Sequence, residues 1–346
     1  MEIEENINLN QSDNSIQNSH KKTNKKSNWA LFKKPKDLSS KLTEKKSQQN
    51  ETNTSNSTAS SNNVSMNSLN SDSTEGLAKP SNFNTHENLI FCLEYRDEIY
   101  KNLMLEEKNA KNVVKSNYFD YQSDINFRMR MILVDWLIDI HNQFKFKLKT
   151  LFQTVRLIDL YLSKVNVLRT KFQLLGVACL LLSSKENEIY YPSLNEFHAI
   201  ADNSFSIAEL KEMEKDIVKV LNFDILIPTC EEFYSILSNM FKLNEEQYYL
   251  GEYFLCCSLV DNSMLKYNPS TIGITCMYIV MKYFNLPEYK DIYSSKKLMG
   301  DTNKKAIKNC AKELCFFVKA LSKSNLLAAK NKYSSNKFYK IAELCE

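Results

Sequence analysis

Glycine and proline, the residues that most often form turns and interrupt helices, number only 5 and 6 in this chain of 346 residues. A chain so short of turn residues is a poor candidate for many short strands, so this feature favours long helices and an all-α fold. The five glycines are also isolated from one another, and no Gly-rich phosphate-binding loop is present. The length allows two ordinary domains and a tail.

The first 85 residues differ in composition from the rest. Between Glu51 and Thr74 nearly every residue is Ser, Thr or Asn, and the few apolar residues have no periodicity. Such a segment cannot bury enough apolar surface to offset the entropy lost on ordering, so residues 1–85 are predicted to form a disordered tail. Between Lys21 and Lys46 the tail holds ten lysines. This cluster is either a nuclear localisation signal or a solvated segment, and the expected location is the nucleus and cytoplasm.

From residue 86 onward, apolar residues recur at the spacing of helices. Leu89–Leu103 predicts a first amphipathic helix. The next predicted helix, Asp124–Phe144, is apolar on nearly every side, so we expect it to be buried at the centre of its domain. Further helices are predicted at Thr150–Ser163, Arg169–Lys185, Ser193–Ala201 and Ser206–Leu221.

A similar series of apolar segments follows Pro228. Its predicted helices are Glu231–Phe241, Gln247–Asp261, Ser270–Phe284 and Lys304–Ala320. Ser270–Phe284 is a long apolar helix that follows a proline. The two series together fit two helical bundles of about 100 residues each, joined near Pro228.

Several classes of protein are disfavoured by the sequence. The nine cysteines have no Cys-x-x-Cys spacing, and none of the four histidines lies near a cysteine or at metal-binding distance from another histidine along the chain. Buried free thiols, with no metal or other cofactor, are therefore expected. No nucleophile elbow, HExxH or kinase signature is present. A net charge of +4 predicts no nucleic-acid partner, and no segment reaches the roughly 20 apolar residues of a membrane span.

Several short segments, in order along the chain, are similar to one family. They read YFDYQSDIN at Tyr118–Asn126, MRMILVDWL at Met129–Leu137, VLR at Val167–Arg169, LLGVACLLLSSK at Leu174–Lys185, EIYYP at Glu188–Pro192, LNFD at Leu221–Asp224, LKYNPS at Leu265–Ser270 and KYSS at Lys332–Ser335. Together they resemble the mitotic (A- and B-type) cyclins over residues 88–344.

The resemblance implies an all-α fold with two consecutive cyclin-box bundles of five helices, after an N-terminal helix and a disordered tail. The implied divisions are the tail 1–85, the N-terminal helix and lead-in 86–123, the N-terminal cyclin box 124–227, the C-terminal cyclin fold 228–330 and an extension 331–346. The implied function is that of a non-catalytic subunit, which binds and activates a cyclin-dependent protein kinase in cell-cycle control at G2/M.

The family also pairs an arginine of its first box helix with an aspartate of the second. In this chain these residues are Arg130 and Asp159. A guanidinium on a buried helix needs a carboxylate partner, so we expect the pair to hold the two helices in register. The alternative is that both side chains are exposed.

The resemblance places kinase-binding residues on two helices. In the family, a lysine that ends the third box helix and a glutamate on the fifth contact the mobile helix of the kinase; here they are Lys185 and Glu214. The apolar part of the surface would be Phe223, Ile225, Leu182, Tyr95 and Ile99. Taken alone, the charged pair is more typical of solvated residues, and the apolar residues are more typical of a core. Glu186 replaces a usual aromatic residue and Tyr191 a usual proline, which leaves the choice of kinase open.

A second surface implied by the family is an exposed apolar groove for substrates or inhibitors that carry a basic-x-leucine motif. The matching residues here are Met129, Ile132, Leu133, Trp136, Arg169 and Gln173. Asp139, one turn beyond Trp136, is placed to pair with the cation of the motif. The alternative is that the stripe belongs to the core.

The route of degradation is open, because residues 1–85 contain no arginine for a destruction box and the Lys185–Asn187 triplet KEN lies inside the predicted fold. Three other functions compete with a kinase activator. They are a helical adaptor like transcription factor IIB or the pocket proteins, a pseudo-cyclin scaffold that binds a kinase without activating it, and an unrecognised enzyme. The adaptor would need a basic DNA-facing surface or a zinc ribbon, and the sequence shows neither.

Overall fold

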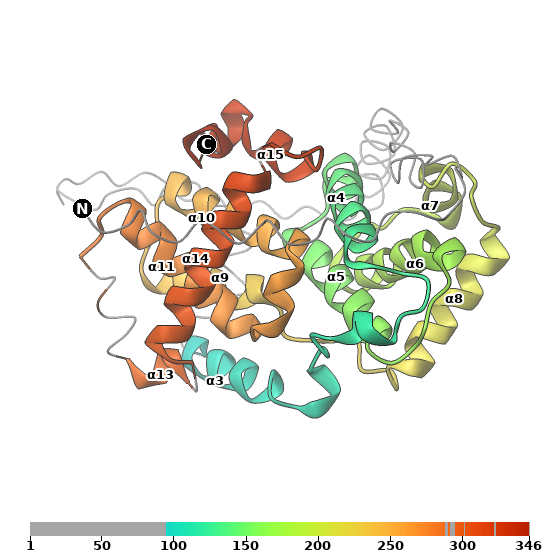
Figure 1. Ribbon diagram of the computed structural model, residues 1–346, viewed down its shortest axis with the longest axis horizontal. Helices are drawn as coiled ribbons and strands as arrows, with labels where there is room; N and C mark the ends of the chain where they lie inside the picture. Colours follow the sequence, from blue (N-terminus) through green and yellow to red (C-terminus); the bar gives the residue numbers. More distant parts are fainter. Residues whose placement is uncertain (1–94, 288–289, 291–294, 301, 322, 346) are drawn as a thin grey trace, which may run out of the picture. The chain divides into compact units, whose positions relative to one another are not determined.

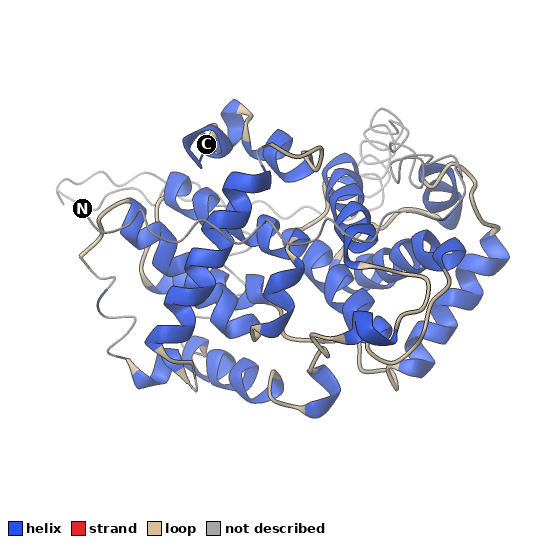
Figure 2. Cartoon of the chain, in the orientation of Figure 1, coloured by secondary structure: helices blue, strands red, loops and turns tan. Residues whose placement is uncertain are grey.

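The computed structural model describes residues 95–346, except 288–289, 291–294, 301, 322 and 346 (Figure 1). The described residues form helices, turns and loops, and none of them is in a strand (Figure 2). The all-α prediction is therefore confirmed. The predicted tail 1–85, its Lys-rich cluster and the first turns of the helix predicted at Leu89–Leu103 lie outside the described residues.

The first half of the described chain begins with one helix and a lead-in. Its elements are α3 (Arg96–Glu106), the 3-10 segments η2 (Ala110–Asn112) and η3 (Tyr118–Tyr121), α4 (Phe127–Phe144), α5 (Leu148–Leu162), α6 (Arg169–Asn187), α7 (Leu194–Ile200) and α8 (Ile207–Val220).

The second half follows without a long linker. Its elements are α9 (Cys230–Met240), α10 (Glu245–Val260), η4 (Asn262–Lys266), α11 (Pro269–Tyr283), α13 (Lys296–Met299), α14 (Lys304–Leu321), α15 (Ala328–Tyr333), η5 (Asn336–Phe338) and η6 (Ile341–Cys345). From α4 to α14, each long helix begins and ends within a helical turn of its predicted range.

Polar caps explain why the helix starts follow the sequence so closely. Four helices begin with a capping box, in which a Ser, Thr or Asn is followed three residues later by Glu or Gln and the two side chains bond each other's backbone N–H groups. The pairs are Ser193 with Glu196, Ser206 with Glu209, Thr229 with Glu232 and Asn244 with Gln247.

The central helix of the first half is α6, not α4. Helix α6 packs between α5 and α8, and its residues from Leu174 to Ser184 are all buried. Helix α4 is also largely buried, but it packs against α10 and α15 of the second half as well as against α5 and α6. The prediction that Asp124–Phe144 lies at the centre of its own domain is therefore wrong. Its apolar residues face two different neighbours.

Helix α11 is the matching central helix of the second half, packed against α9, α10 and α14. A close approach to α9 depends on Gly273. A Cβ atom at this position would stand 2.8 Å from Cβ of Phe233 and 2.9 Å from the carbonyl oxygen of Cys230, which is closer than packed atoms normally come.

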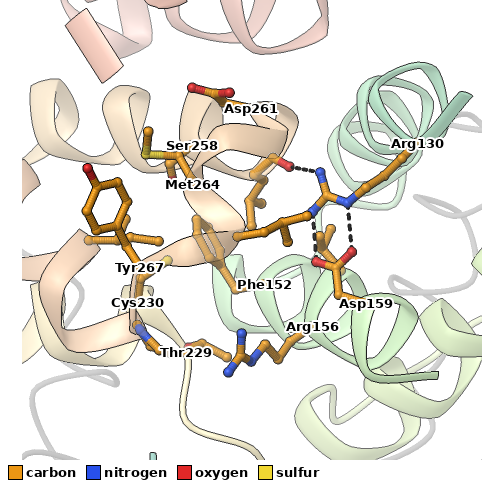
Figure 3. Close-up of a pocket in the computed structure, with 15 residues that line it drawn as sticks. Arg130, Phe152, Arg156, Asp159, Thr229, Cys230, Ser258, Asp261, Met264 and Tyr267 are labelled. Atoms are coloured by element: carbon orange, nitrogen blue, oxygen red, sulfur yellow. Dashed lines mark hydrogen bonds and ion pairs between the residues drawn. The ribbon is translucent and has the colours of Figure 1, made fainter. Parts of the chain in front are cut away.

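A buried ion pair joins three helices at the junction of the two halves (Figure 3). Arg130 on α4 donates from Nε and Nη2 to the two carboxylate oxygens of Asp159 on α5, both at 2.7 Å. Its Nη1 donates to the carbonyl oxygen of Leu259 on α10 at 2.9 Å. The Tyr118 hydroxyl adds a 2.9 Å hydrogen bond to Asp159. Burial alone would lower the pKa of Arg130, but the Asp159 carboxylate holds this pKa above its usual value.

Helix α3 is attached mainly to the second half. It packs on α9, and the buried Tyr100 hydroxyl donates to the carbonyl oxygen of Leu298 at 2.8 Å. The buried carboxylate of Glu107, just after α3, accepts from the N–H and the hydroxyl of Ser270 at 3.0 and 2.6 Å. The N-terminal turn of α11 therefore holds the end of α3.

The short helix α15 was not predicted from the sequence, and it packs on both α4 and α10. The Asp135 carboxylate of α4 accepts from the N–H of Ala328, the first residue of α15, at 3.0 Å. At the other end of α15, the fully buried Tyr333 donates to Glu252 on α10 at 3.2 Å. The C-terminal segment therefore joins the two halves, as Arg130 does.

Replacing Asp159 with Ala is expected to lower the free energy of unfolding by about 3–5 kcal/mol, because the buried guanidinium of Arg130 then has no counter-ion. Urea unfolding followed by circular dichroism measures this loss. Lys149→Ala removes an exposed pair with Glu232, at 3.0 Å between α5 and α9, and is the matched control with an expected loss below about 1 kcal/mol. Equal losses in the two variants would contradict the assigned role of the buried pair.

Candidate functional site

The two charged residues predicted to bind a kinase form an ion pair at the surface. Lys185 lies in the last turn of α6 and Glu214 lies on α8, which packs against α6. The Lys185 ammonium donates to Oε1 of Glu214, while their side chains are 37% and 18% exposed. An exposed pair adds little to stability. An ammonium has three N–H donors, so Lys185 keeps donors for another molecule.

The aromatic residue predicted for this surface is largely exposed to solvent. Phe223 is 77% exposed and follows the end of α8. It and the preceding Asn222 have positive φ angles of 63° and 52°, in the left-handed region. A bulky side chain seldom adopts this conformation, and it costs of order 1 kcal/mol or more. An unfavourable backbone conformation thus accompanies the exposure of this apolar side chain. Strained residues of this kind are typical of binding sites.

Hydrogen bonds hold this loop next to the end of α6. Gln153 on α5 donates to the carbonyl oxygen of Ile225 at 2.9 Å and accepts from Asn187, the last residue of α6, at 2.6 Å. Lys111 in η2 forms an ion pair with Asp224 at 2.8 Å. The structure thus brings Lys185, Glu214, Phe223 and the half-buried Ile225 to one surface.

Three predicted members lie elsewhere. Leu182 is only 6% exposed, so it belongs to the core of the first half and not to an open surface. Tyr95 and Ile99 are 52% and 36% exposed, at the beginning of α3. Figure 1 shows α3 beside α9 and α13 and away from α8. A single partner would have to span both halves to contact Tyr95 and Phe223 together.

Sequence reasoning missed three exposed apolar side chains near the pair. Leu226, three residues after Phe223, is 66% exposed, and Ile189 and Tyr190 after α6 are 81% and 49% exposed. Apolar residues in a loop between two predicted helices were the available signal. The adjacent Glu188 has a structural role, because it accepts from the N–H of Lys147 and the hydroxyl of Thr150 at the start of α5. Glu186 is exposed.

We define the α6–α8 surface as Lys185, Glu214, Phe223, Leu226 and Ile189. It combines one ion pair with three exposed apolar side chains. Such a surface fits a protein partner, since apolar anchors beside a few polar groups are what protein interfaces use.

The apolar stripe predicted to be an exposed groove is covered in this structure. Met129, Ile132, Leu133 and Trp136 on α4 are 3%, 7%, 0% and 5% exposed. The expectation that these side chains are exposed is therefore wrong here. Leu133 is covered because Gly176 lets α6 approach it, to the point that a Cβ on Gly176 would stand 2.9 Å from Leu133 Cδ1. Helices α10 and α15 pack on α4 as well.

The polar members of the predicted groove stay accessible. Arg169 is exposed at the first residue of α6, and its backbone N–H donates to Asp124 at 2.7 Å. Gln173, one turn later, is half-buried and accepts from Ser204 at 3.2 Å. Asp139 is half-buried on α4. The role of this edge in docking stays a prediction.

The structure gives no indication of a metal site within its described ranges, where no three His, Cys, Asp or Glu residues come together to hold an ion. The eight cysteines in these ranges are free, and six of them are buried. Burial raises the pKa of Cys230 and of Cys310 to about 12, so neither thiol is a reactive nucleophile. Of the described helices, none has the length and apolarity needed to cross a membrane.

Comparison with known families matches both halves of the chain. Residues 98–226 match the family described as "Cyclin, N-terminal domain" and residues 228–346 match "Cyclin, C-terminal domain". Among solved structures, the X-ray structure of a viral cyclin from herpesvirus saimiri has a TM-score of 0.52 and 21% sequence identity. The match covers 62% of this chain and 97% of that one, and it supports the fold.

Relatives of known name are similar over most of the described chain. The G2/mitotic-specific cyclin-B of Hydra vulgaris is 32% identical over 255 residues, which cover 74% of this chain and 69% of that protein. The G2/mitotic-specific cyclin-B2 of Gallus gallus is 34% identical, with 74% and 63% covered. The G2/mitotic-specific cyclin-A of Hydra viridissima is 33% identical, with 72% and 59% covered. The matches therefore span about three fifths to two thirds of these relatives' lengths.

Asp135, next to Trp136 on α4, is expected to make stability depend on pH. Burial raises the pKa of Asp135 to about 7, against the hydrogen bond from Ala328, and Asp139 raises this pKa further. Because the pKa is raised in the folded protein, the stabilising contribution is present at low pH and is lost as the pH rises through about 7.

The variant Asp135→Asn keeps an oxygen for the N–H of Ala328 but cannot ionise. We expect it to unfold at a higher temperature than the wild type at pH 8 and to show a clearly smaller difference at pH 5, because the loss grows from about pH 4 to pH 7. Thermal unfolding at the two pH values measures this. If the unfolding temperature of the wild type instead rose above that of the variant between pH 5 and pH 8, the ionised carboxylate would stabilise α15. This result would contradict the raised pKa assigned to Asp135.

Proposed function

We propose that this chain, which belongs to the cyclin family and is of the mitotic type, binds and activates a cyclin-dependent protein kinase. Cyclins are non-catalytic regulatory subunits of kinases that act in the cell cycle, and the chemistry then belongs to the partner. We further propose that this chain acts at G2/M, as the names of its relatives suggest.

The observation that carries the proposal is the α6–α8 surface. Lys185 and Glu214 are the residues that the family resemblance assigns to kinase contact, and they form an ion pair. The exposed Phe223 follows α8, the helix that carries Glu214. The Lys185 ammonium can donate to carbonyl oxygens at the end of a partner helix. The Glu214 carboxylate orients the ammonium and can accept from partner N–H groups.

The proposed mechanism is a shift between two states of the kinase. Phosphoryl transfer requires that the mobile helix of a kinase place its glutamate against the lysine that orients ATP. A partner that binds this helix only in its active position favours the active state by its difference in affinity for the two states. The rigid support of the α6–α8 surface suits this role, because Gln153 fixes the loop after α8 to the end of α6.

We also propose that the edge formed by Arg169, Gln173 and Asp139 docks substrates or inhibitors with a basic-x-leucine motif. The Asp139 carboxylate would pair with the cation of the motif, while the leucine would contact the stripe around Trp136. Because Trp136 is only 5% exposed, such docking requires side chains on α4 to become uncovered. The proposal therefore includes a local rearrangement when substrate binds.

Lys185→Ala is expected to reduce activation of a cyclin-dependent kinase at least tenfold, which corresponds to about 1.4 kcal/mol of binding or activation free energy. The assay mixes the purified chain with a panel of monomeric kinases and measures phosphorylation of a linker histone. Lys171→Ala is the matched control, because Lys171 lies near the other end of α6 with a similar ion pair to Glu209 at 2.5 Å.

Each outcome of this assay has a distinct meaning. Activation by the wild type and by Lys171→Ala, lost in Lys185→Ala, supports the proposal. Binding without activation by the wild type would indicate a scaffold. If no kinase in the panel binds at all, the family assignment would hold as a fold and an adaptor function would replace the proposed one.

Asp139→Lys is expected to raise the KM of the active complex for a substrate peptide with a basic-x-leucine motif about tenfold, because it places a cation against the cation of the motif. A peptide with the same phosphorylation site but without the motif is the control, and its KM should not change. Equal changes in the KM values of both peptides would contradict docking at this edge.

A further inference from the structure

A row of lysines runs along the outer face of α14, the long helix that lies across the second half in Figure 1. Lys305, Lys308, Lys312 and Lys319 are all exposed, whereas the opposite face of the helix is buried in the core. At 3.6 residues per turn, these four lysines fall within an arc of about 60°. The row is a single stripe of positive charge with about one residue per turn.

Three of the four lysines have no acidic partner in the part of the chain that the structure describes. No ion pair joins Lys305, Lys308 or Lys312 to a described carboxylate. Glu313, the acid next to Lys312 in sequence, pairs instead with Lys266 at 2.9 Å. Like charges one turn apart destabilise a helix, and an exposed helix usually alternates the two signs. Solvation of a surface helix does not require this arrangement.

An apolar side chain interrupts the stripe between its third and fourth lysines. Phe316, one turn after Lys312 and one turn before Lys319, is 77% exposed, which is as exposed as Phe223 on the α6–α8 surface. Helix α14 already buries Ile307, Leu314 and Val318 on its inner face, so the fold does not need Phe316 for packing. A large aromatic ring surrounded by cations is the composition of an interface anchor.

We propose that this face of α14, the lysine stripe with Phe316, docks an acidic segment of a partner protein that carries an apolar residue at the level of Phe316. Glutamates one turn apart on a helix would match the spacing of the lysines. The site is on the second half, away from the α6–α8 surface in Figure 1, so a partner here and a partner there can bind together.

Two other anionic partners fit the geometry less well. A membrane surface would be bound through a broad apolar face, but α14 presents a single exposed aromatic ring and its apolar face is used in the core. The grooves of DNA are read by helices that can enter them. DNA would take up the lysines through its phosphates but would leave the exposed ring of Phe316 without an apolar partner.

The test uses the full chain and a fluorescein-labelled helical peptide, with glutamates at one-turn intervals and a central leucine. Fluorescence anisotropy measures its affinity. Lys308→Glu combined with Lys312→Glu is expected to weaken binding more than tenfold, and Phe316→Ala about fivefold. The control combines Lys164→Glu with Lys211→Glu, which makes the same change of net charge at exposed lysines outside the second half, and should stay within twofold of the wild type.

Circular dichroism and the unfolding temperature confirm that each variant is folded before it is compared. Absence of saturable binding by the wild type would overturn the proposal. So would equal weakening in the control variant, which would indicate attraction by net charge alone, or unchanged affinity in Phe316→Ala. Anionic phospholipid vesicles and a DNA duplex are tested in parallel. The choice of a protein partner would be overturned if either bound more tightly than the peptide and if Lys308→Glu with Lys312→Glu weakened that binding.

Discussion

A buried guanidinium at the junction of the two halves fixes how their helices meet. Arg130 donates two hydrogen bonds to Asp159 and one to the carbonyl oxygen of Leu259, so it joins α4 and α5 of the first half to α10 of the second. A buried charge is tolerated only where its counter-ion and hydrogen bonds are complete. The orientation of α4 is therefore fixed in relation to both halves, and this explains why an apolar helix lies at a junction and not inside one bundle.

The α6–α8 surface depends on that arrangement indirectly. Helix α6 is central, and Gly176 allows Leu133 of α4 to pack directly against it. The end of α6 is thereby set in the first half, and Lys185 in its last turn meets Glu214 on α8. The loop that follows α8 is held by Gln153 and presents Phe223 in a conformation that costs free energy. Activation of a partner requires such a surface to be rigid, because a surface that adapts to both states of a kinase favours neither.

The sequence predicted where the helices begin and end better than it predicted which helices pack against one another. Periodicity and capping residues such as Ser206 and Asn244 are local, and the structure follows them closely. The family resemblance supplied the partners of Arg130 and Lys185, which no local pattern reveals. The exposure of Trp136 was predicted wrongly, because the burial of a side chain depends on what packs on its helix and not on the helix's own sequence. The packing of α15 on α4 was also missed, since α15 is too short to give a periodic signal. An apolar stripe on a helix is either buried within the fold or used to bind a partner. The sequence alone does not distinguish these two possibilities.

Phe223 and Phe316 are both exposed, but their surroundings differ. Each is 77% exposed, although most phenylalanines among the described residues are buried or half-buried. Around Phe223 the backbone is strained and the charged pair is complete, so the ring is the main unused group of the α6–α8 surface. Around Phe316 the backbone is an ordinary helix and the charges repel one another, so the ring and Lys305, Lys308 and Lys312 are all unused. A surface of the first kind suits one tightly defined partner. A surface of the second kind gains most from a partner that brings opposite charge, and its affinity should fall steeply as salt is added.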